Sequence, residues 1–316
     1  MDTHADTLAR VTSTEAVRYC YRHPDRETGL SCSECGRPIC YECMTPAPVG
    51  LRCPDHSGKP QGVKKVTRAA ERAVTGVGGR RTNVVTLTLI GINLAVYLAE
   101  LGAGGTINGT NNWLFEHGAS ILSAVYIQGQ IQLVPAGVTV PPGFELVGFA
   151  HGEWWRIFTP MFLHYGPFHL AMNMYSLYFA GSILESIIGR WRFLLLYVVS
   201  GLAGSAGAFL WSPDSIGVGA SGAIFGVLGA LFVLERRGNI STGGQIAGLI
   251  LINLVFTFAL SRFISVGAHV GGLVGGVIVM FLMLRANRSA AIAVGAAAVV
   301  TVAAVVVSYW QARGYA

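Results

Sequence analysis

The sequence predicts an all-α polytopic membrane protein that is preceded by a small, polar, cysteine-rich region. Three observations predict this fold class. Of the 316 residues, 52% are hydrophobic and only 12% are charged, whereas soluble domains carry roughly 25% charged residues. Residues 1–81 hold 13 of the 22 Lys and Arg and 9 of the 16 Asp and Glu. All six cysteines lie between residues 20 and 53. This composition excludes a disordered chain, a fibrous protein and an ordinary soluble enzyme.

Seven apolar stretches are expected to cross the membrane. A helix needs about 20 residues to span roughly 30 Å of hydrocarbon, and strands of an open sheet cannot satisfy their backbone groups there. The first stretch runs from Val84 to Leu101. The other six contain no Asp, Glu, Lys or Arg and cover 157–184, 193–213, 215–234, 238–261, 263–284 and 289–312. Gln and Pro interrupt the charge-free stretch 117–144, so we interpret it as loop or interfacial structure.

The basic residues predict a cytoplasmic N-terminus. With that orientation, thirteen Lys and Arg flank the spans on the cytoplasmic side, and three lie outside, namely Arg156, Arg262 and Arg313. This bias follows the positive-inside rule. It also accounts for the net charge of +6, so no nucleic-acid partner is expected. We expect a multi-pass protein of the cell (plasma) membrane. Residues 1–10 are polar, so no signal peptide is expected and the first span would act as the insertion signal.

The cysteines fall into a regular series of pairs that two histidines complete. Two residues separate the members of each pair: Cys20 and His23, Cys32 and Cys35, Cys40 and Cys43, and Cys53 and His56. This spacing lets both side chains converge on one ion, and thiolate and imidazole ligands suit zinc. Eight ligands are enough for two tetrahedral sites without an open position, so we expect two structural zinc ions and no cofactor for catalysis. A disulfide framework is disfavoured because the region is expected on the reducing, cytoplasmic side.

The zinc-binding region is expected to cover residues 15–57 and to be followed by a basic linker, 58–82. So short a region has little apolar core, and bound metal would supply most of its folding free energy. The linker is expected to lie against anionic lipid headgroups. A cytoplasmic protein partner is expected for the zinc-binding region.

Costly polar side chains near the starts of three spans suggest a site in the outer leaflet. They come from the second, fourth and sixth spans: His169 with Asn173, Ser221 between Gly219 and Gly222, and His269. Because alternate spans run in the same direction, these residues are expected at one depth. A serine with a histidine provides a nucleophile and its base, and a second histidine with an amide suits an oxyanion. Each motif alone is weak, since small residues are common where membrane helices pack.

Together, these motifs resemble those of the rhomboid family of intramembrane serine proteases. The matching motifs, in the family's order, are Trp155-Arg156, the HxxxN of His169 and Asn173, the GxSG around Ser221, and the AHxxGxxxG from Ala268 to Gly276. The resemblance implies a six-helix rhomboid core at 83–285, with an additional transmembrane helix and the C-terminus at 286–316. It further implies that the protein cleaves transmembrane or membrane-adjacent segments of other membrane proteins.

The resemblance also implies a role for each matching residue. Ser221 would be the nucleophile and His269 the general base and later acid, without a third, acidic member. The Ser221 backbone N–H, His169 and Asn173 would form the oxyanion hole. Supporting positions would be His164, Trp155, Arg156, Gly219 and Gly222.

The cysteine-rich region resembles a B-box-type zinc finger over about residues 19–57. That resemblance implies that the first and third pairs share one zinc and that the second and fourth pairs share the other. Sequential pairing of the ligands stays open at this point.

Two other functions compete with the protease. A catalytically silent, rhomboid-like membrane protein that binds or escorts clients would be expected to lack the serine or the histidine, and this chain has both. A small transporter would be expected to show internal repeats and broken helices, and we find no convincing repeat among the spans.

Overall fold

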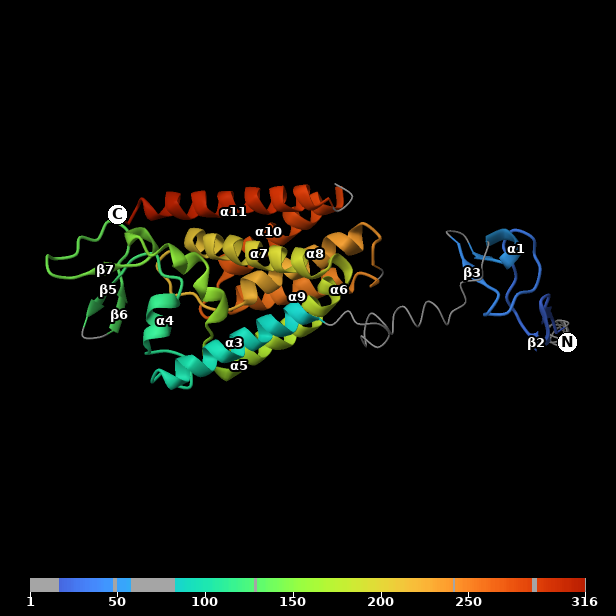
Figure 1. Cartoon of the computed structure of the whole chain (residues 1–316), viewed down its shortest axis with the longest axis horizontal. Helices are drawn as coiled ribbons and strands as arrows, with labels where there is room; N and C mark the ends of the chain where they lie inside the picture. Colours follow the sequence, from blue (N-terminus) through green and yellow to red (C-terminus); the bar gives the residue numbers. More distant parts are fainter. Residues whose placement is uncertain are drawn as a thin grey trace, which may run out of the picture. The chain divides into compact units, whose positions relative to one another are not determined.

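The structure is a computed structural model that describes residues 17–47, 50–57, 83–127, 130–240, 242–285 and 289–315. The expected linker, residues 58–82, lies outside the described residues. So does Arg288, one of the basic residues used to predict the orientation. The chain separates into two compact units, Met1–Arg80 and Arg81–Ala316 (Figure 1).

The N-terminal unit consists of two small antiparallel sheets and a helical turn. Its elements are β1 (Tyr19–Cys20) paired with β2 (His23–Glu27), β3 (Thr45–Pro46) paired with β4 (Leu51–Arg52), and α1 (Pro54–Ser57). The buried side chains include Ile39 and five of the six cysteines. A core of this size stabilises a fold only weakly, which fits the expectation that metal binding supplies most of the folding free energy.

The second unit is built mainly of helices. In chain order, the longer segments are α3 (Val84–Gly102), α5 (Gly166–Ser176), the π-helical η4 (Leu177–Gly181), α6 (Ser182–Ile188), α7 (Arg190–Trp211), α8 (Ser221–Arg236), α9 (Gln245–Ala259), α10 (Val266–Arg285) and α11 (Ala290–Ala312). Helices α3, α7, α10 and α11 are each long and apolar enough to cross a membrane. The chain is therefore a multi-pass membrane protein.

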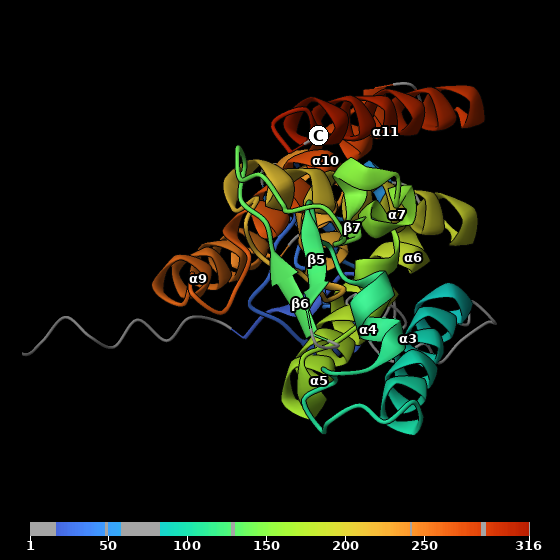
Figure 2. The ribbon, with the colours of Figure 1, turned by 90° about the vertical axis from the view of Figure 1, so that its left-hand side faces the viewer.

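Helices α7, α8 and α10 form the centre of this unit. Twelve of the 16 residues of α8 are buried, and the end-on view in Figure 2 shows α11, α9, α5 and α3 arranged around the centre. Glycines let α8 and α10 pack backbone against backbone. A Cβ on Gly272 would overlap the carbonyl oxygen of Gly222, and one on Gly276 would overlap that of Gly226. This close packing fixes the relative position of the two helices that carry Ser221 and His269.

Several of the expected spans begin or end elsewhere than the sequence predicted. The expected second span began at residue 157, but α5 begins at Gly166 because 3-10 turns η2 (Trp154–Ile157) and η3 (Thr159–Phe162) precede it. The expected fourth span began at 215, but α8 begins at Ser221 because Gly219, with φ of +125°, cannot be helical. Within the described residues, α8 and α9 have 16 and 15 residues, so these two helices are shorter than the expected fourth and fifth spans.

The long first loop contains a small sheet that the sequence did not predict. The loop holds α4 (Trp113–Gly118), β5 (Ala124–Ile127), β6 (Gln130–Leu133), β7 (Leu146–Val147) and the 3-10 turn η1 (Phe149–His151). The antiparallel sheet has the order β6-β5-β7. Its apolar cluster packs against Ile216 and Val218, and Ser120 pairs with Gly217 in an isolated bridge. The loop therefore supports the segment that leads into Ser221.

A buried carboxylate connects α3 to α6. The carboxylate of Glu185 on α6 accepts hydrogen bonds from the backbone N–H groups of Val85 (3.1 Å) and Thr86 (2.8 Å) and from the Thr86 hydroxyl (2.8 Å). The first N–H groups of a helix have no partner within the helix and favour negative charge. Glu185 thus caps α3 from a neighbouring helix.

Candidate active site and metal clusters

Ser221 and His269 lie at the starts of two adjacent helices and form a hydrogen bond. Ser221 is the first residue of α8, and His269 lies in the first turn of α10. The distance from the Ser221 Oγ to the His269 Nε2 is 2.8 Å. His269 is 7% exposed, so few water molecules compete for this contact. A serine hydroxyl and an imidazole in this arrangement can act as a nucleophile and its base.

Two residues that sequence reasoning missed hold the His269 ring. Phe225, one helical turn after Ser221, stacks on the imidazole with ring centroids 4.0 Å apart and an interplanar angle of 18°. The Nδ1 of His269 lies 2.7 Å from the hydroxyl of Thr257 on α9. Phenylalanine and threonine are ordinary residues of apolar helices, so nothing in the sequence distinguished them.

His169 faces the space beside Ser221. The backbone N–H of Tyr165 donates to its Nδ1 at 3.3 Å, which leaves the proton of a neutral ring on Nε2. A Cβ built on Gly219 would lie 2.7 Å from the His169 Cε1, 3.0 Å from its Nε2 and 3.8 Å from the Ser221 Oγ. Gly219 therefore keeps open the space between a hydrogen-bond donor and the serine.

Asn173 lies one turn further along the same helix and is buried. Its Nδ2 donates to the backbone carbonyl of His169 at 2.9 Å, which uses one of the two amide protons. His164 is fully buried, and its ring centroid lies 5.2 Å from that of His169. Both ring nitrogens of His164 lack a hydrogen-bond partner among the described residues. Buried polar atoms of this kind usually bind ordered water.

Trp155 and Arg156 connect parts of the first loop. The Trp155 Nε1 donates to the carbonyl of His117 at 2.9 Å. Arg156 is fully buried, and it donates to the Glu153 carboxylate at 2.7 Å and to the carbonyl of Ala119 at 2.9 Å. Among the described residues, these hydrogen bonds stay within the first loop, and neither side chain reaches Ser221. Gly222 instead lies at the crossing with α10, where its Cβ would meet the carbonyl oxygen of Ala268 at 3.2 Å.

In the N-terminal unit, the eight Cys and His side chains form two clusters of four. One cluster contains Cys20, His23, Cys40 and Cys43, and the other contains Cys32, Cys35, Cys53 and His56. The first pair in the sequence therefore lies with the third, and the second with the fourth, which excludes sequential pairing in this structure. Within each cluster, the potential ligand atoms all lie within 4.8 Å of one another.

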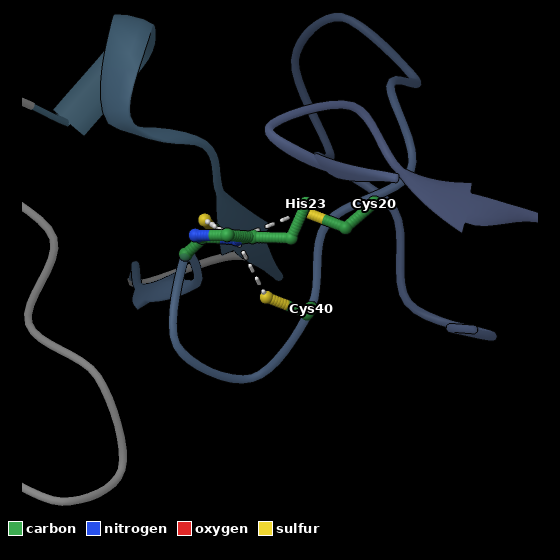
Figure 3. A group of neighbouring side chains, drawn as sticks. Cys20, His23 and Cys40 are labelled. Carbon is green, nitrogen blue, oxygen red and sulfur yellow. Dashed lines mark hydrogen bonds between the residues drawn. The ribbon is translucent and has the colours of Figure 1, made fainter. Parts of the chain in front are cut away.

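The separations between potential ligand atoms in contact range from 3.1 to 3.9 Å, close to those around a tetrahedral zinc ion. Zn–S bonds of about 2.3 Å and Zn–N bonds of about 2.0–2.1 Å place tetrahedral ligands roughly 3.6 to 3.8 Å apart. The Nδ1 of His23 lies 3.8 Å from the Cys20 Sγ, 3.5 Å from the Cys40 Sγ and 3.3 Å from the Cys43 Sγ. Figure 3 shows His23 beside Cys20 and Cys40. In the other cluster, the Cys35 and Cys53 sulfurs are 3.8 Å apart. Both clusters fit a metal ion.

Backbone amides prepare one thiol of each cluster for metal binding. Burial disfavours the Cys20 thiolate, but hydrogen bonds from the backbone of Cys40 and Arg22, with those from the His23 and Cys40 side chains, together lower the pKa of Cys20 to about 6. Burial likewise opposes ionisation of Cys32, and backbone hydrogen bonds from Cys35 and Cys53 lower its pKa to about 6. The thiolate is the form of cysteine that binds metal.

Comparison with known proteins finds the rhomboid domain. The family model of that domain matches residues 151–286. This range contains His169, Asn173, Ser221 and His269, whereas the N-terminal unit, the sheet of the first loop and α11 lie outside it. All four residues that the sequence placed at the site are thus inside the matched domain.

Three relatives illustrate the similarity. Rhomboid protease GluP of Bacillus subtilis (strain 168) is 47% identical over 126 residues, which are 39% of this chain and 24% of that protein. YdcA of the same organism is 40% identical over 120 residues, 38% of this chain and 60% of that protein. RHOMBOID-like protein 1 of Arabidopsis thaliana is 40% identical over 118 residues, 37% of this chain and 30% of that protein. The chain thus spans less than two thirds of the length of each of these relatives.

Proposed function

We propose that this chain is a rhomboid intramembrane serine protease that cleaves transmembrane or membrane-adjacent segments of other membrane proteins. The observation that carries the proposal is the 2.8 Å hydrogen bond between the Ser221 Oγ and the His269 Nε2, on two helices whose glycine contacts hold them together. The match of residues 151–286 to the rhomboid domain supports the same reaction class.

The first half of the reaction forms an acyl-enzyme. The Ser221 Oγ attacks the carbonyl carbon of the scissile peptide bond while its proton moves to the His269 Nε2. The resulting oxyanion would be stabilised by the Ser221 backbone N–H, the Nε2–H of His169 and the free amide proton of Asn173. Donors held in place before the reaction are effective because they need no reorganisation as the charge develops.

His269 then gives its proton to the leaving amine as the peptide C–N bond breaks, and this completes the acyl-enzyme. In the second half, a water molecule attacks the ester carbonyl while His269 accepts the water's proton. The ester bond then breaks, His269 returns the proton to the Ser221 Oγ, and the acid product is released. Water must therefore reach a site inside the bilayer. The buried, unpartnered nitrogens of His164 beside His169 are well suited to hold such water.

The position of the site favours substrates that enter from the bilayer. Helix α9 contacts α8 and α10, and its described residues are mostly exposed, with Ile250 and Thr257 as its buried ones. Such an apolar outer surface is expected to face lipid. A substrate helix that unwinds locally at this level would present an extended segment to Ser221.

For the whole chain, we propose seven membrane spans with the N-terminus in the cytoplasm of a plasma membrane. In this arrangement α5-η4-α6, α8 and α9 cross together with the four longer helices. We further propose a B-box-type N-terminal domain that binds two structural zinc ions and contacts a cytoplasmic protein. Each bound zinc ion would stabilise the fold of this domain.

Cleavage by purified protein tests the proposal. The full chain, reconstituted in liposomes, is incubated with a panel of transmembrane segments that contain helix-destabilising residues. The wild type should cleave at least one segment, and Ser221→Ala and His269→Ala should each abolish cleavage. Binding of segments without cleavage by the wild type would instead favour the catalytically silent, client-binding function.

A further inference from the structure

Thr257 occupies a position from which it can control the tautomer of His269. It lies on α9, is 1% exposed, and its hydroxyl is 2.7 Å from the Nδ1 of His269. The same hydroxyl donates to the backbone carbonyl of Asn253, one turn earlier on α9, at 2.7 Å. A threonine hydroxyl has only one proton to donate but can accept further hydrogen bonds.

Because the Thr257 proton is used by the Asn253 carbonyl, the contact with His269 requires the proton of the imidazole to be on Nδ1. A neutral imidazole with its proton on Nδ1 has a lone pair on Nε2. That lone pair is the acceptor that the Ser221 hydroxyl needs at 2.8 Å. In the opposite tautomer, Nε2 would carry the proton and donate it to the Ser221 oxygen. No group would then accept the proton of the Ser221 hydroxyl.

We propose that Thr257 is a positioning residue that completes a Ser221–His269–Thr257 chain of hydrogen bonds. The inference rests on the proposed function, because it assigns the orientation of the same base. Thr257 holds His269 in the reactive tautomer and fixes the ring about its axis, as an acidic third residue does in other serine hydrolases. Being neutral, it does so without placing a charge in the apolar core of the helices.

The contact also makes the dyad depend on the docking of α9. Ile250 and Thr257 are the buried residues of α9 among those described. Ile250 packs in the apolar core, and Thr257 connects α9 to His269. Loss of the contact would leave a buried N–H of His269 without a partner, which is costly. Conversely, the tautomer of His269 with its proton on Nδ1 binds Thr257 and so favours the packing of α9 against α8 and α10.

The test compares Thr257→Val with Thr257→Ser in the full-length protein. Valine keeps the shape and removes the acceptor, whereas serine keeps the hydroxyl. We expect Thr257→Val to lower kcat by about 10-fold or more with KM within about twofold of wild type, because a buried donor then lacks a partner. Thr257→Ser should restore kcat to within about threefold of wild type, since the same acceptor is present.

Ser308→Ala is the matched control. The Ser308 hydroxyl also donates to the carbonyl one turn earlier, that of Ala304, at 2.8 Å and in a buried position, but it lies on α11 away from His269. The Ser308→Ala variant should leave kcat unchanged. Rates are normalised to the amount of folded protein. If Thr257→Val yields no folded protein, Thr257→Ala is used instead, because it also removes the hydroxyl.

Labelling by a fluorophosphonate separates this inference from the proposed function. If the wild type is not labelled at Ser221, the proposed protease function fails and the role of Thr257 fails with it. If the wild type is labelled and cleaves, but Thr257→Val retains the kcat of Ser308→Ala, or Thr257→Ser is as slow as Thr257→Val, the proposed role of Thr257 alone is overturned.

Discussion

Substitution of Gly219 by alanine should strongly lower the proposed protease activity by displacing His169. The added Cβ would lie 2.7 Å from the His169 Cε1, whereas carbon atoms in contact are normally about 3.5–4.0 Å apart. The imidazole must therefore move by about 1 Å or the backbone must shift. Loss of one oxyanion donor typically lowers kcat by about 100- to 1,000-fold, and we expect a loss in this range for Gly219→Ala.

The same substitution should also destabilise the fold. Gly219 has φ of +125°, which L-residues rarely adopt, and such strain costs about 1–3 kcal/mol. Gly143→Ala is the control, because Gly143 has φ of +103° and its Cβ would meet no atom within 4 Å. It should show the strain without the loss of activity.

The assay measures kcat and KM on a reconstituted transmembrane substrate, together with thermal unfolding in detergent. Both variants should unfold at lower temperature than wild type, and only Gly219→Ala should lose kcat. Equal kcat values for Gly219→Ala and Gly143→Ala would refute the proposal that the oxyanion lies in the space between His169 and Ser221.

Three further predictions concern other parts of the chain. Metal analysis should find two zinc ions bound to the N-terminal unit, and a zinc chelator should unfold this unit. Ser221 should stay reactive to a fluorophosphonate after chelation. Loss of this reactivity would show that Ser221 depends on the bound zinc. Glu185→Ala should lower the free energy of unfolding by about 3 kcal/mol, measured by denaturation in mixed micelles, because two backbone donors and a hydroxyl lose their acceptor. Tyr315→Phe removes the 2.8 Å hydrogen bond from the Tyr315 hydroxyl to Asp214 and should speed amide exchange in residues 212–217; unchanged exchange would show that this contact does not hold the loop.

The residues with distinctive chemistry could be identified from the sequence. The Cys and His pairs have a spacing that few structures other than metal sites require, and the structure groups them into two clusters. Ser221 and His269 stood out because hydroxyl and imidazole groups are costly near the ends of apolar spans. The structure brings the two together at hydrogen-bond distance, while their roles in catalysis stay predictions.

The helix boundaries and the supporting residues could not be identified in this way. A stretch without charges does not reveal whether it is helical, so the 3-10 turns before α5 and the bend at Gly219 were counted as parts of spans. The sheet of the first loop was missed because β5 and β6 are four residues each, too short for a clear alternating pattern. Thr257 and Phe225 act only through contacts with His269 that depend on how α8, α9 and α10 pack.

The most direct test of the account is the covalent labelling of Ser221. The full-length protein in liposomes is treated with a fluorophosphonate, and the adduct is located by mass spectrometry in the wild type, in Ser221→Ala and in His269→Ala. We expect an adduct on Ser221 of the wild type and none in either variant. A folded wild type without an adduct, or labelling of Ser221 at the wild-type rate in His269→Ala, would contradict the claim that these two residues form a catalytic dyad.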